Sequence, residues 1–364
     1  MRSALFENHF GIVPDVVAIG HGRANLIGEH TDYNDGLVMP VLLRHHTVVA
    51  LSPRDDNMIY GVSDRFDTLN RPVESPCDGS WLDFVHGALV IAGQNGFSSK
   101  IKGQGGVNIA VSSNVPAGAG VSSSAAFEIA LLRALGSLAP NVFDRISPAH
   151  LARMGQQIEH EFVGTNCGIM DQMIAAVAPV NQAMLFDIRS METRCLPLFV
   201  GHDFLVIHSG ADRKLSEGAY NERLLQCRNA ACEMGVTSLR DADLAGCARL
   251  ADPLLQKRAR HVISENIRVQ DAVVALETGK ADKFGQLMDD CHISLDVDFD
   301  VSSPILNALV ANLKAAGAIG ARLTGAGFGG CVIALCAREQ SAHILAAISS
   351  SNPKAWLVDR IEGL

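Results

Sequence analysis

The sequence predicts an α+β protein with two domains. Its 364 residues exceed the length that one hydrophobic core usually serves, so two domains are the expected arrangement. Short runs of β-branched and apolar residues between turn signals dominate the first part of the chain, which is typical of strands. Residues 217–291 instead show largely helical patterning with charges on one face. A strand-rich stretch followed by a helix-rich stretch favours an α+β architecture.

The expected elements follow in order along the chain. Early strands are predicted at residues 16–19, 38–43, 47–51 and 107–111. Helical spacing of apolar residues predicts helices at residues 81–92, 123–137, 147–162 and 302–316. Later strands are predicted at residues 183–187 and 204–207, which we expect to pair, and at residues 331–335.

The most plausible domain seam lies around residues 190–202. We therefore expect a first domain at residues 1–200 and a second at residues 201–352. For the final segment, residues 353–364, a return to the first domain is an alternative.

Composition excludes several classes of protein. The chain is 48% hydrophobic and 19% charged, which is typical of a globular protein. Its net charge of -9 offers no broad basic face, so we do not expect nucleic-acid binding. The start lacks the apolar stretch of a signal peptide, and the longest uncharged run is too rich in Gly, Ser and Pro for a membrane span. Nine scattered cysteines without a CxxC pair suit a reducing compartment, so we expect a cytoplasmic protein.

Residues 22–35 form the most informative segment, a polar loop between two apolar runs. The polar members of this segment are Arg23, Asn25, Glu29, His30, Asp32, Asn34 and Asp35. Carboxylates accept hydroxyl protons, and amides both donate and accept, so the loop suits a ligand covered in hydroxyl groups. The alternative is an ordinary polar surface loop. The apolar runs at residues 16–19 and 37–39 argue against it, because they read as buried strands.

A glycine-rich loop at residues 116–125 leads directly into a predicted helix. Glycines let backbone N–H groups turn toward one point, and the helix N-terminus adds positive potential, so the loop suits a phosphate. Serine hydroxyls can bind phosphate oxygens or Mg²⁺. No Lys follows the glycines, which excludes a Walker A loop, and the spacing is not that of a Rossmann fingerprint. A plain turn is the alternative. The candidate ligand-binding residues are Pro116, Gly118, Ala119, Gly120, Val121, Ser122, Ser123 and Ser124.

Two further segments carry candidate site residues. Glu159, near the end of a predicted helix, is a candidate metal ligand, with an exposed carboxylate as the alternative. Asp171 stands among bulky apolar residues, so it must be paired or functional if it is buried; a helix N-cap is the alternative. Residues 323–331 hold four glycines within six positions before a predicted buried strand, which indicates a tight loop where another backbone can approach.

These four segments, in this order, resemble the galactokinases within the GHMP family of small-molecule kinases. The resemblance covers nearly the whole chain, and its first and third motifs are specific to sugar kinases of the galactokinase type. The matching stretches are residues 22–33 for the galactokinase signature, 116–125 for the ATP loop, 167–172 for the Cys-Gly-Ile-Met-Asp-Gln segment and 323–331 for the C-terminal glycine loop.

The chain departs from the family pattern at four places. His21 stands where the family usually has Pro, Val121 replaces a Leu, and Ala326 replaces a Gly, which we expect to crowd the backbone. Gly-Ala precedes Tyr220 where galactokinases commonly carry Ser-Glu. None of these changes removes a proposed catalytic group.

The resemblance implies a fold and a reaction. The fold would be the two-domain GHMP-kinase fold: an N-terminal domain like domain 2 of ribosomal protein S5, a C-terminal ferredoxin-like α/β domain, and ATP in the cleft between them beneath the two glycine loops. The reaction would be the ATP-dependent, Mg²⁺-assisted phosphorylation of the anomeric hydroxyl of D-galactose, in galactose catabolism. The alternatives are a kinase of the same family for N-acetylgalactosamine or arabinose, or a non-catalytic sugar and ATP sensor.

At matching positions the resemblance also implies roles. Arg23 would assist the reacting hydroxyl or stabilise charge on the transferred phosphoryl group, and Asp171 would be the base or the anchor of the attacking hydroxyl. Ser124, with Ser123 as the alternative, would join Glu159 on Mg²⁺. The sugar pocket would be lined by Glu29, His30, Asp32, Gly168 and Tyr220. Phosphoryl transfer needs positioning, metal and electrostatics more than covalent chemistry, and these residue types supply them.

Overall fold

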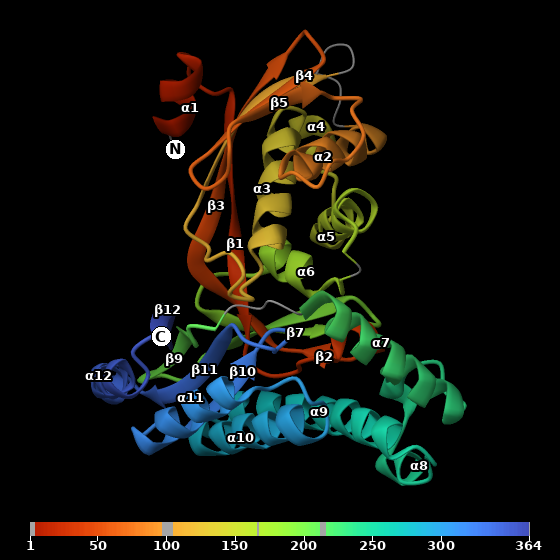
Figure 1. Ribbon diagram of the computed structural model, residues 1–364, viewed down its shortest axis with the longest axis vertical. Coiled ribbons are helices and arrows are strands. Elements are labelled where there is room, and N and C mark those ends of the chain that lie inside the picture. The colour runs from red at the N-terminus through yellow and green to blue at the C-terminus, as the bar shows by residue number, and fades with distance from the viewer. Residues whose placement is uncertain (1–3, 97–104, 166, 212–215, 364) are drawn as a thin grey trace. The chain divides into compact units, whose positions relative to one another are not determined.

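The computed structural model describes residues 4–96, 105–165, 167–211 and 216–363, and its backbone forms two compact units (Figure 1). Unit 1 comprises Met1–Gly22, Arg44–Pro116 and Ser122–Val177. Unit 2 comprises Arg23–Leu43, Ala117–Val121 and Ala178–Leu364. Both units combine helices and strands, as the α+β prediction requires.

Unit 1 is built from strands with helices on both faces. Its strands are β1 (Val16–Asn25) and β3 (Pro40–Arg54), whose ends reach into the ranges of unit 2, β4 (Met58–Ser63), β5 (Leu69–Pro72) and β6 (Gly106–Ser113). Its helices are α1 (Ala4–Phe10), α2 (Leu82–Gln94), α3 (Ser123–Ser137), α4 (Pro140–Phe143), α5 (Pro148–Ile158) and α6 (Met170–Val177). Strand β3 pairs with β1 and also with β6, which runs antiparallel to it. Strand β6 also pairs with β4, which is parallel to it, and β4 pairs with the antiparallel strand β5.

The strand period of two explains how unit 1 is packed. Val49 and Leu51 of β3 point into a core shared with α2, α3 and α5, whereas Ala50 between them packs with Phe6 of α1 on the opposite face. Figure 1 shows α1 on one side of these strands and α2, α3 and α5 on the other.

Unit 2 contains two sets of strands and most of the long helices. Its strands are β2 (Leu37–Val38), β7 (Gln182–Asp187), β8 (Glu192–Pro197), β9 (His202–His208), β10 (Gly320–Thr324), β11 (Cys331–Ala337) and β12 (Trp356–Glu362). Its helices are α7 (Ser216–Glu233), α8 (Leu244–Cys247), α9 (Pro253–Glu277), α10 (Ala281–Val297), α11 (Pro304–Ala315) and α12 (Ser341–Ser351). Strands β10, β11, β9 and β12 form an antiparallel sheet in that order, while β2 and β8 flank β7.

Glycine permits a close approach of helix α10 to this sheet. A Cβ added to Gly320 of β10 would lie 2.3 Å from the carbonyl oxygen of Gly285 on α10. Among the helices formed by the described residues, none is long and apolar enough to cross a membrane.

Most predicted helices are confirmed. The helix at residues 123–137 has the predicted bounds, and the helix at residues 81–92 appears as α2. The helix predicted at residues 147–162 ends sooner: α5 stops at Ile158, and the backbone continues as a π-helical turn, Glu159–Val163.

Three strand predictions are corrected by the structure. Residues 38–43 and 47–51 do not form two strands; most of them belong to β3, because the polar residues Arg44, His45 and His46 continue the extended backbone. Residues 183–187 and 204–207 were expected to pair, but β7 lies between β2 and β8, and β9 lies between β11 and β12. Strand pairing depends on distant segments, which local patterning does not reveal.

The residue ranges of the two units do not follow the expected domain boundary at residue 200. Residues 23–43 and 117–121 belong to unit 2 although they come from the first half of the chain. Hydrogen bonds explain this, since the Asn25 N–H donates to Thr324 Oγ1 at 3.0 Å. The final strand β12 pairs with β9 and so stays in unit 2 rather than returning to the first domain.

Candidate active site

Arg23 and Asn25, at the end of β1, bind the first glycine loop and the residue that precedes the second. Arg23 is buried; its Nη1 donates to the Gly120 carbonyl at 2.6 Å, and its backbone N–H donates to the Val121 carbonyl at 3.0 Å. Asn25 bonds Thr324, which immediately precedes the second loop. The loop at residues 117–121 and the loop at residues 325–330 are therefore both tied to the start of the polar segment.

Glu29 anchors the polar segment to the C-terminal glycine loop. Its Oε1 accepts from the Gly325 N–H at 2.7 Å and forms an ion pair with Arg322 Nη2 at 2.9 Å. Both side chains are buried, 0% exposed for Arg322 and 3% for Glu29. The sequence placed Glu29 in the sugar pocket but missed its partner. An arginine within the otherwise apolar run of β10 was the available signal.

His30 has an uncommon backbone conformation and lies among aromatic residues. Its φ is +61°, and its Nδ1 lies 2.8 Å from the Tyr33 hydroxyl, while its Nε2 lies 3.3 Å from the Ala326 carbonyl. A carbonyl only accepts, so Nε2 carries the proton and Nδ1 accepts from Tyr33. Burial raises the pKa of Tyr33 well above its usual range, which keeps that hydroxyl protonated as a donor. Ala326 is not among the residues with positive φ, so its methyl group adds no backbone strain of that kind.

The other residues expected to contact the sugar lie in both units. The Tyr220 ring on α7 is 5.9 Å from that of His30 and 5.3 Å from that of Tyr33, so the altered sequence before Tyr220 does not separate it from the polar segment. Asp32 is half-buried and begins a short 3-10 turn, Asp32–Asn34. Gly168 is half-buried in unit 1, directly after Cys167.

The first glycine loop has left-handed backbone at alternate positions before α3. The φ angles are +71° at Gly118, +76° at Gly120 and +60° at Ser122. This alternation favours convergence of successive N–H groups, as in an anion-binding nest. Ser122 precedes α3 without capping it, because its hydroxyl donates instead to Asp171 Oδ2. The first N–H groups of α3 are therefore not capped by Ser122, which suits binding of an external anion.

Asp171 lies inside the first turn of α6 rather than before it. Helix α6 begins at Met170, so an N-cap role does not match the bounds of the helix. The bond from Ser122 joins Asp171 to the residue at the start of α3.

Glu159 belongs to a buried acidic cluster that the sequence revealed only in part. Gln172 Nε2 donates to Glu159 Oε2 at 2.8 Å and to Glu128 Oε2 at 3.0 Å, and the Cys167 thiol donates to Glu159 at 3.2 Å. Burial raises the pKa of Glu159, and it raises that of the fully buried Glu128 well above the usual range. A hydrogen bond from Ser124 acts in the opposite direction on Glu159. Glu128 was missed although it follows Ser124 by one helical turn.

These oxygen donors suit Mg²⁺. Ser124 and Glu159 are in contact, and Mg²⁺ is usually bound by one or two carboxylates together with phosphate oxygens and waters. In the described part of the chain, no group of three or more His, Cys, Asp or Glu side chains could hold a metal by itself. A magnesium ion at Ser124 and Glu159 would therefore depend on the nucleotide for further ligands.

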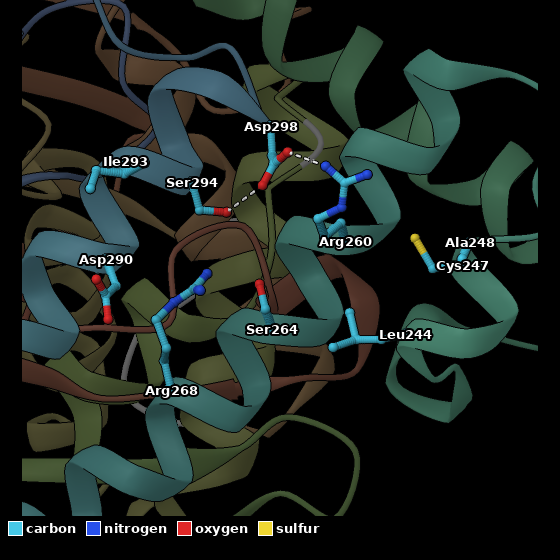
Figure 2. Close-up of a pocket in the computed structure, with 10 residues that line it drawn as sticks. All are labelled: Leu244, Cys247, Ala248, Arg260, Ser264, Arg268, Asp290, Ile293, Ser294 and Asp298. Carbon is cyan, nitrogen blue, oxygen red and sulfur yellow. Dashed lines mark hydrogen bonds and ion pairs between the residues drawn. The ribbon is translucent and has the colours of Figure 1, made fainter.

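A separate pocket of about 460 Å³ lies in unit 2 among α8, α9 and α10 (Figure 2). It contains none of the residues that the sequence assigned to the site. Its two arginines are already paired, Arg260 with Asp298 at 3.0 Å and Arg268 with Glu265 at 2.6 Å.

Three protein-family models match the chain in sequence order. They are the galactokinase galactose-binding signature at residues 4–53, the GHMP kinases N terminal domain at residues 88–178 and the GHMP kinases C terminal domain at residues 272–354. The signature covers the polar segment and the strands that flank it.

Solved structures of kinases share this fold. The chain is 29% identical to Lactococcus lactis galactokinase, solved in complex with galactose, with a TM-score of 0.87 over 98% of this chain and 97% of that one. Mevalonate kinase from Methanococcus jannaschii is 17% identical, with a TM-score of 0.72 and coverage of 95% and 98%. Streptococcus pneumoniae phosphomevalonate kinase is 16% identical, with a TM-score of 0.69 and coverage of 95% and 99%. At this identity the last two show likeness of fold alone.

Proposed function

The chain belongs to the galactokinases of the GHMP kinase family, and from this premise we propose that it transfers the γ-phosphoryl group of ATP to the anomeric hydroxyl of galactose. The products are galactose 1-phosphate and ADP. The observation that carries the proposal is the galactokinase galactose-binding signature, which falls on a polar segment fixed by buried hydrogen bonds. The likeness to a galactokinase crystallised with galactose supports the choice of sugar.

The sugar is bound by residues that offer hydrogen bonds and an aromatic surface. We assign His30, Asp32 and Tyr220 to direct contacts, because the three come from the polar segment and from the ring that packs on it. Glu29 contributes to the pocket mainly by holding the polar segment in place, because its Oε1 is bound to Arg322 and Gly325. Gly168 is the remaining residue that we assign to the sugar site.

ATP is bound by the first glycine loop and the start of α3. The members of this site are Pro116, Gly118, Ala119, Gly120, Val121, Ser122, Ser123 and Ser124, and the uncapped helix start supports it. Ser124 and Glu159 would hold Mg²⁺, which neutralises phosphate charge when bound. Calorimetry can test this assignment: Glu159→Ala should weaken Mg²⁺-dependent ATP binding and leave galactose binding unchanged.

Asp171 and Arg23 act on the reacting atoms. The anomeric oxygen forms a bond to the γ-phosphorus, the bond to the β–γ bridging oxygen breaks, and ADP leaves with that electron pair. Asp171 accepts the hydroxyl proton or orients the hydroxyl for attack, and Arg23 stabilises the charge that develops on the phosphoryl oxygens. The link from Arg23 to the Gly120 carbonyl supports a role close to the phosphates.

The proposed setting is the cytoplasm, in galactose catabolism, with a free sugar and ATP as the partners. None of the nine cysteines, all of which lie in the described part of the chain, forms a disulfide, which supports a reducing compartment.

A panel of free sugars, assayed for ADP formation with Mg²⁺ and ATP, tests the function. We expect turnover with galactose and little with glucose. Turnover with only N-acetylgalactosamine or arabinose would show that the protein is a sugar kinase whose substrate is not galactose. Galactose binding without any ADP formation would identify a sensor instead.

A further inference from the structure

Helix α9 contacts the polar segment through a fully buried carboxylate, that of Glu265. Its Oε1 accepts from the backbone N–H of Gly28 at 2.7 Å and from that of Glu29 at 3.3 Å. Its Oε2 pairs with Arg268 Nε on the next turn of α9 at 2.6 Å. Glu265 thus binds the backbone immediately before His30, from a helix far along the chain.

Two neighbours of Glu265 on α9 bind other parts of the same segment. The Leu37 N–H donates to Asn266 Oδ1 at 2.8 Å, and His261 Nε2 lies 3.1 Å from the Glu29 carbonyl. One region of the helix therefore contacts both ends of the segment between Gly28 and Leu37. The segment has little room to adjust, because a Cβ added to Gly28 would lie 2.6 Å from the Leu37 carbonyl oxygen.

The environment of Glu265 stabilises its negative charge. Burial alone raises the pKa of a carboxyl group, yet Arg268, His261 and Arg322 together hold the pKa of Glu265 at about 2. The Cys291 thiol donates to Oε1 at 3.0 Å as well. The two N–H groups of the segment therefore bind an ionised acceptor, and such charge-assisted hydrogen bonds are stronger than neutral ones.

Arg268 connects this carboxylate to the pocket drawn in Figure 2. Its side chain is mostly buried and lines the pocket, and its Nη2 has no hydrogen-bond partner among the described residues. Arg260 lines the same pocket two turns earlier but pairs with Asp298, as the dashed line in Figure 2 shows. The two arginines thus share a helix and a pocket, and only Arg268 contacts Glu265.

We infer that Glu265 is a positioning residue for the sugar: its carboxylate, held by Arg268, fixes the Gly28–Glu29 backbone and thereby places His30 and Asp32 for galactose. The inference rests on the proposed function as far as galactose is concerned. Its structural core, the restraint of the backbone by Glu265, is independent of any substrate. The reaction itself does not use Glu265, so the expected effect is on sugar binding rather than on phosphoryl transfer.

The substitution Glu265→Gln keeps the size of the side chain and removes its charge. Hydrogen exchange of the peptide spanning residues 26–31 should accelerate about 10- to 100-fold, because two charge-assisted bonds weaken. The galactose dissociation constant from calorimetry and the KM for galactose should rise about 10- to 100-fold, with kcat within about threefold and the KM for ATP unchanged. The matched control, Arg260→Gln, should leave all five quantities unchanged.

A second variant guards against misfolding caused by the unpaired charge on Arg268. If Glu265→Gln does not fold, the double variant Glu265→Gln with Arg268→Gln removes both charges and is expected to show the same exchange and binding changes. Unchanged exchange and a galactose affinity within twofold of wild type, in either folded variant, would overturn the inference. Equal losses of galactose and ATP affinity would also overturn it, since they indicate general loosening. A wild-type protein that binds no galactose refutes the proposed function, while the exchange measurement still decides the role of Glu265.

Discussion

Asp171 is joined by a hydrogen bond to Ser122, a residue at the junction of the glycine loop and α3. Asp171→Asn retains the shape and can still accept from Ser122, but it removes the negative charge and the proton acceptor. We expect kcat to fall by at least ~10²-fold, the lower end for loss of a general base, with the fold intact. Coupled ADP detection measures the rate, and circular dichroism checks the fold.

Ser122→Ala provides the control for this experiment, because it removes the hydrogen bond and keeps the carboxylate. We expect a smaller loss of kcat in Ser122→Ala than in Asp171→Asn. A rate near that of wild type in Asp171→Asn would make Asp171 a structural residue.

His261 makes the folding stability depend on pH. Burial lowers its pKa to about 4 from an ordinary value of 6.5, although the hydrogen bond from its Nε2 to the Glu29 carbonyl acts in the opposite direction. Between these two values the unfolded chain binds a proton that the folded chain does not. The contribution of neutral His261 to the free energy of unfolding is therefore fully present above pH 6.5. It is lost as the pH falls toward 4, and the loss is about 2 kcal/mol at pH 5.

The measurement compares wild type with His261→Gln, which keeps a donor but does not titrate. Urea unfolding at pH 7 and pH 5 should show a drop in the free energy of unfolding that is about 2 kcal/mol smaller in the variant. Equal drops in the two proteins would show that His261 is protonated in the folded state.

The first glycine loop requires left-handed backbone at Gly120, where φ is +76°. Gly120→Val places a β-branched side chain in a conformation that it rarely adopts, and its bulk obstructs the approach of a phosphate. We expect the KM for ATP to rise at least tenfold, together with a loss of roughly 1–2 kcal/mol in stability.

Gly79→Val is the matched control, because Gly79 has a φ of +80° in a turn before α2 and open space around its Cβ position. It should lose a similar amount of stability without any change in the KM for ATP. If the KM for ATP is the same in Gly120→Val and Gly79→Val, the first glycine loop is not part of the ATP site.

The elements were predictable where the signal was local. Helix α3 matched its predicted bounds because a glycine-serine start precedes a continuous apolar helix. Strand partners were not predictable, since β7 and β9 each pair with segments that are distant in sequence. The same limit applied to the site: the polar segment and the glycine loops were evident, but Arg322, Glu265 and Gln172 contact site residues only through the tertiary fold.

Long-range hydrogen bonds help to determine which residues form each unit. The sequence suggested a single boundary, yet residues 23–43 and 117–121 group with the C-terminal half. Arg23, Asn25 and Glu29 account for this, because they bind Gly120, Thr324 and Gly325. Such pairings between distant groups have no local sequence signature, which is why the boundary was placed differently.

Selective binding of galactose should also be measurable as stability of the whole molecule. A ligand at one hundred times its dissociation constant that binds only the folded state adds about 2.7 kcal/mol, or about 3 °C in Tm for a chain of this length. Glucose differs only at C4, but a pocket built to hydrogen-bond one hydroxyl geometry leaves buried groups unpaired with the epimer. Each lost bond to a charged group costs roughly 1.5–3 kcal/mol, so glucose should bind about 10- to 10⁴-fold more weakly. At the same concentration glucose should therefore give no more than about half of the galactose shift, and Asp32→Ala should bring the two shifts together. Equal shifts for both sugars in the wild-type protein would contradict a pocket specific for galactose.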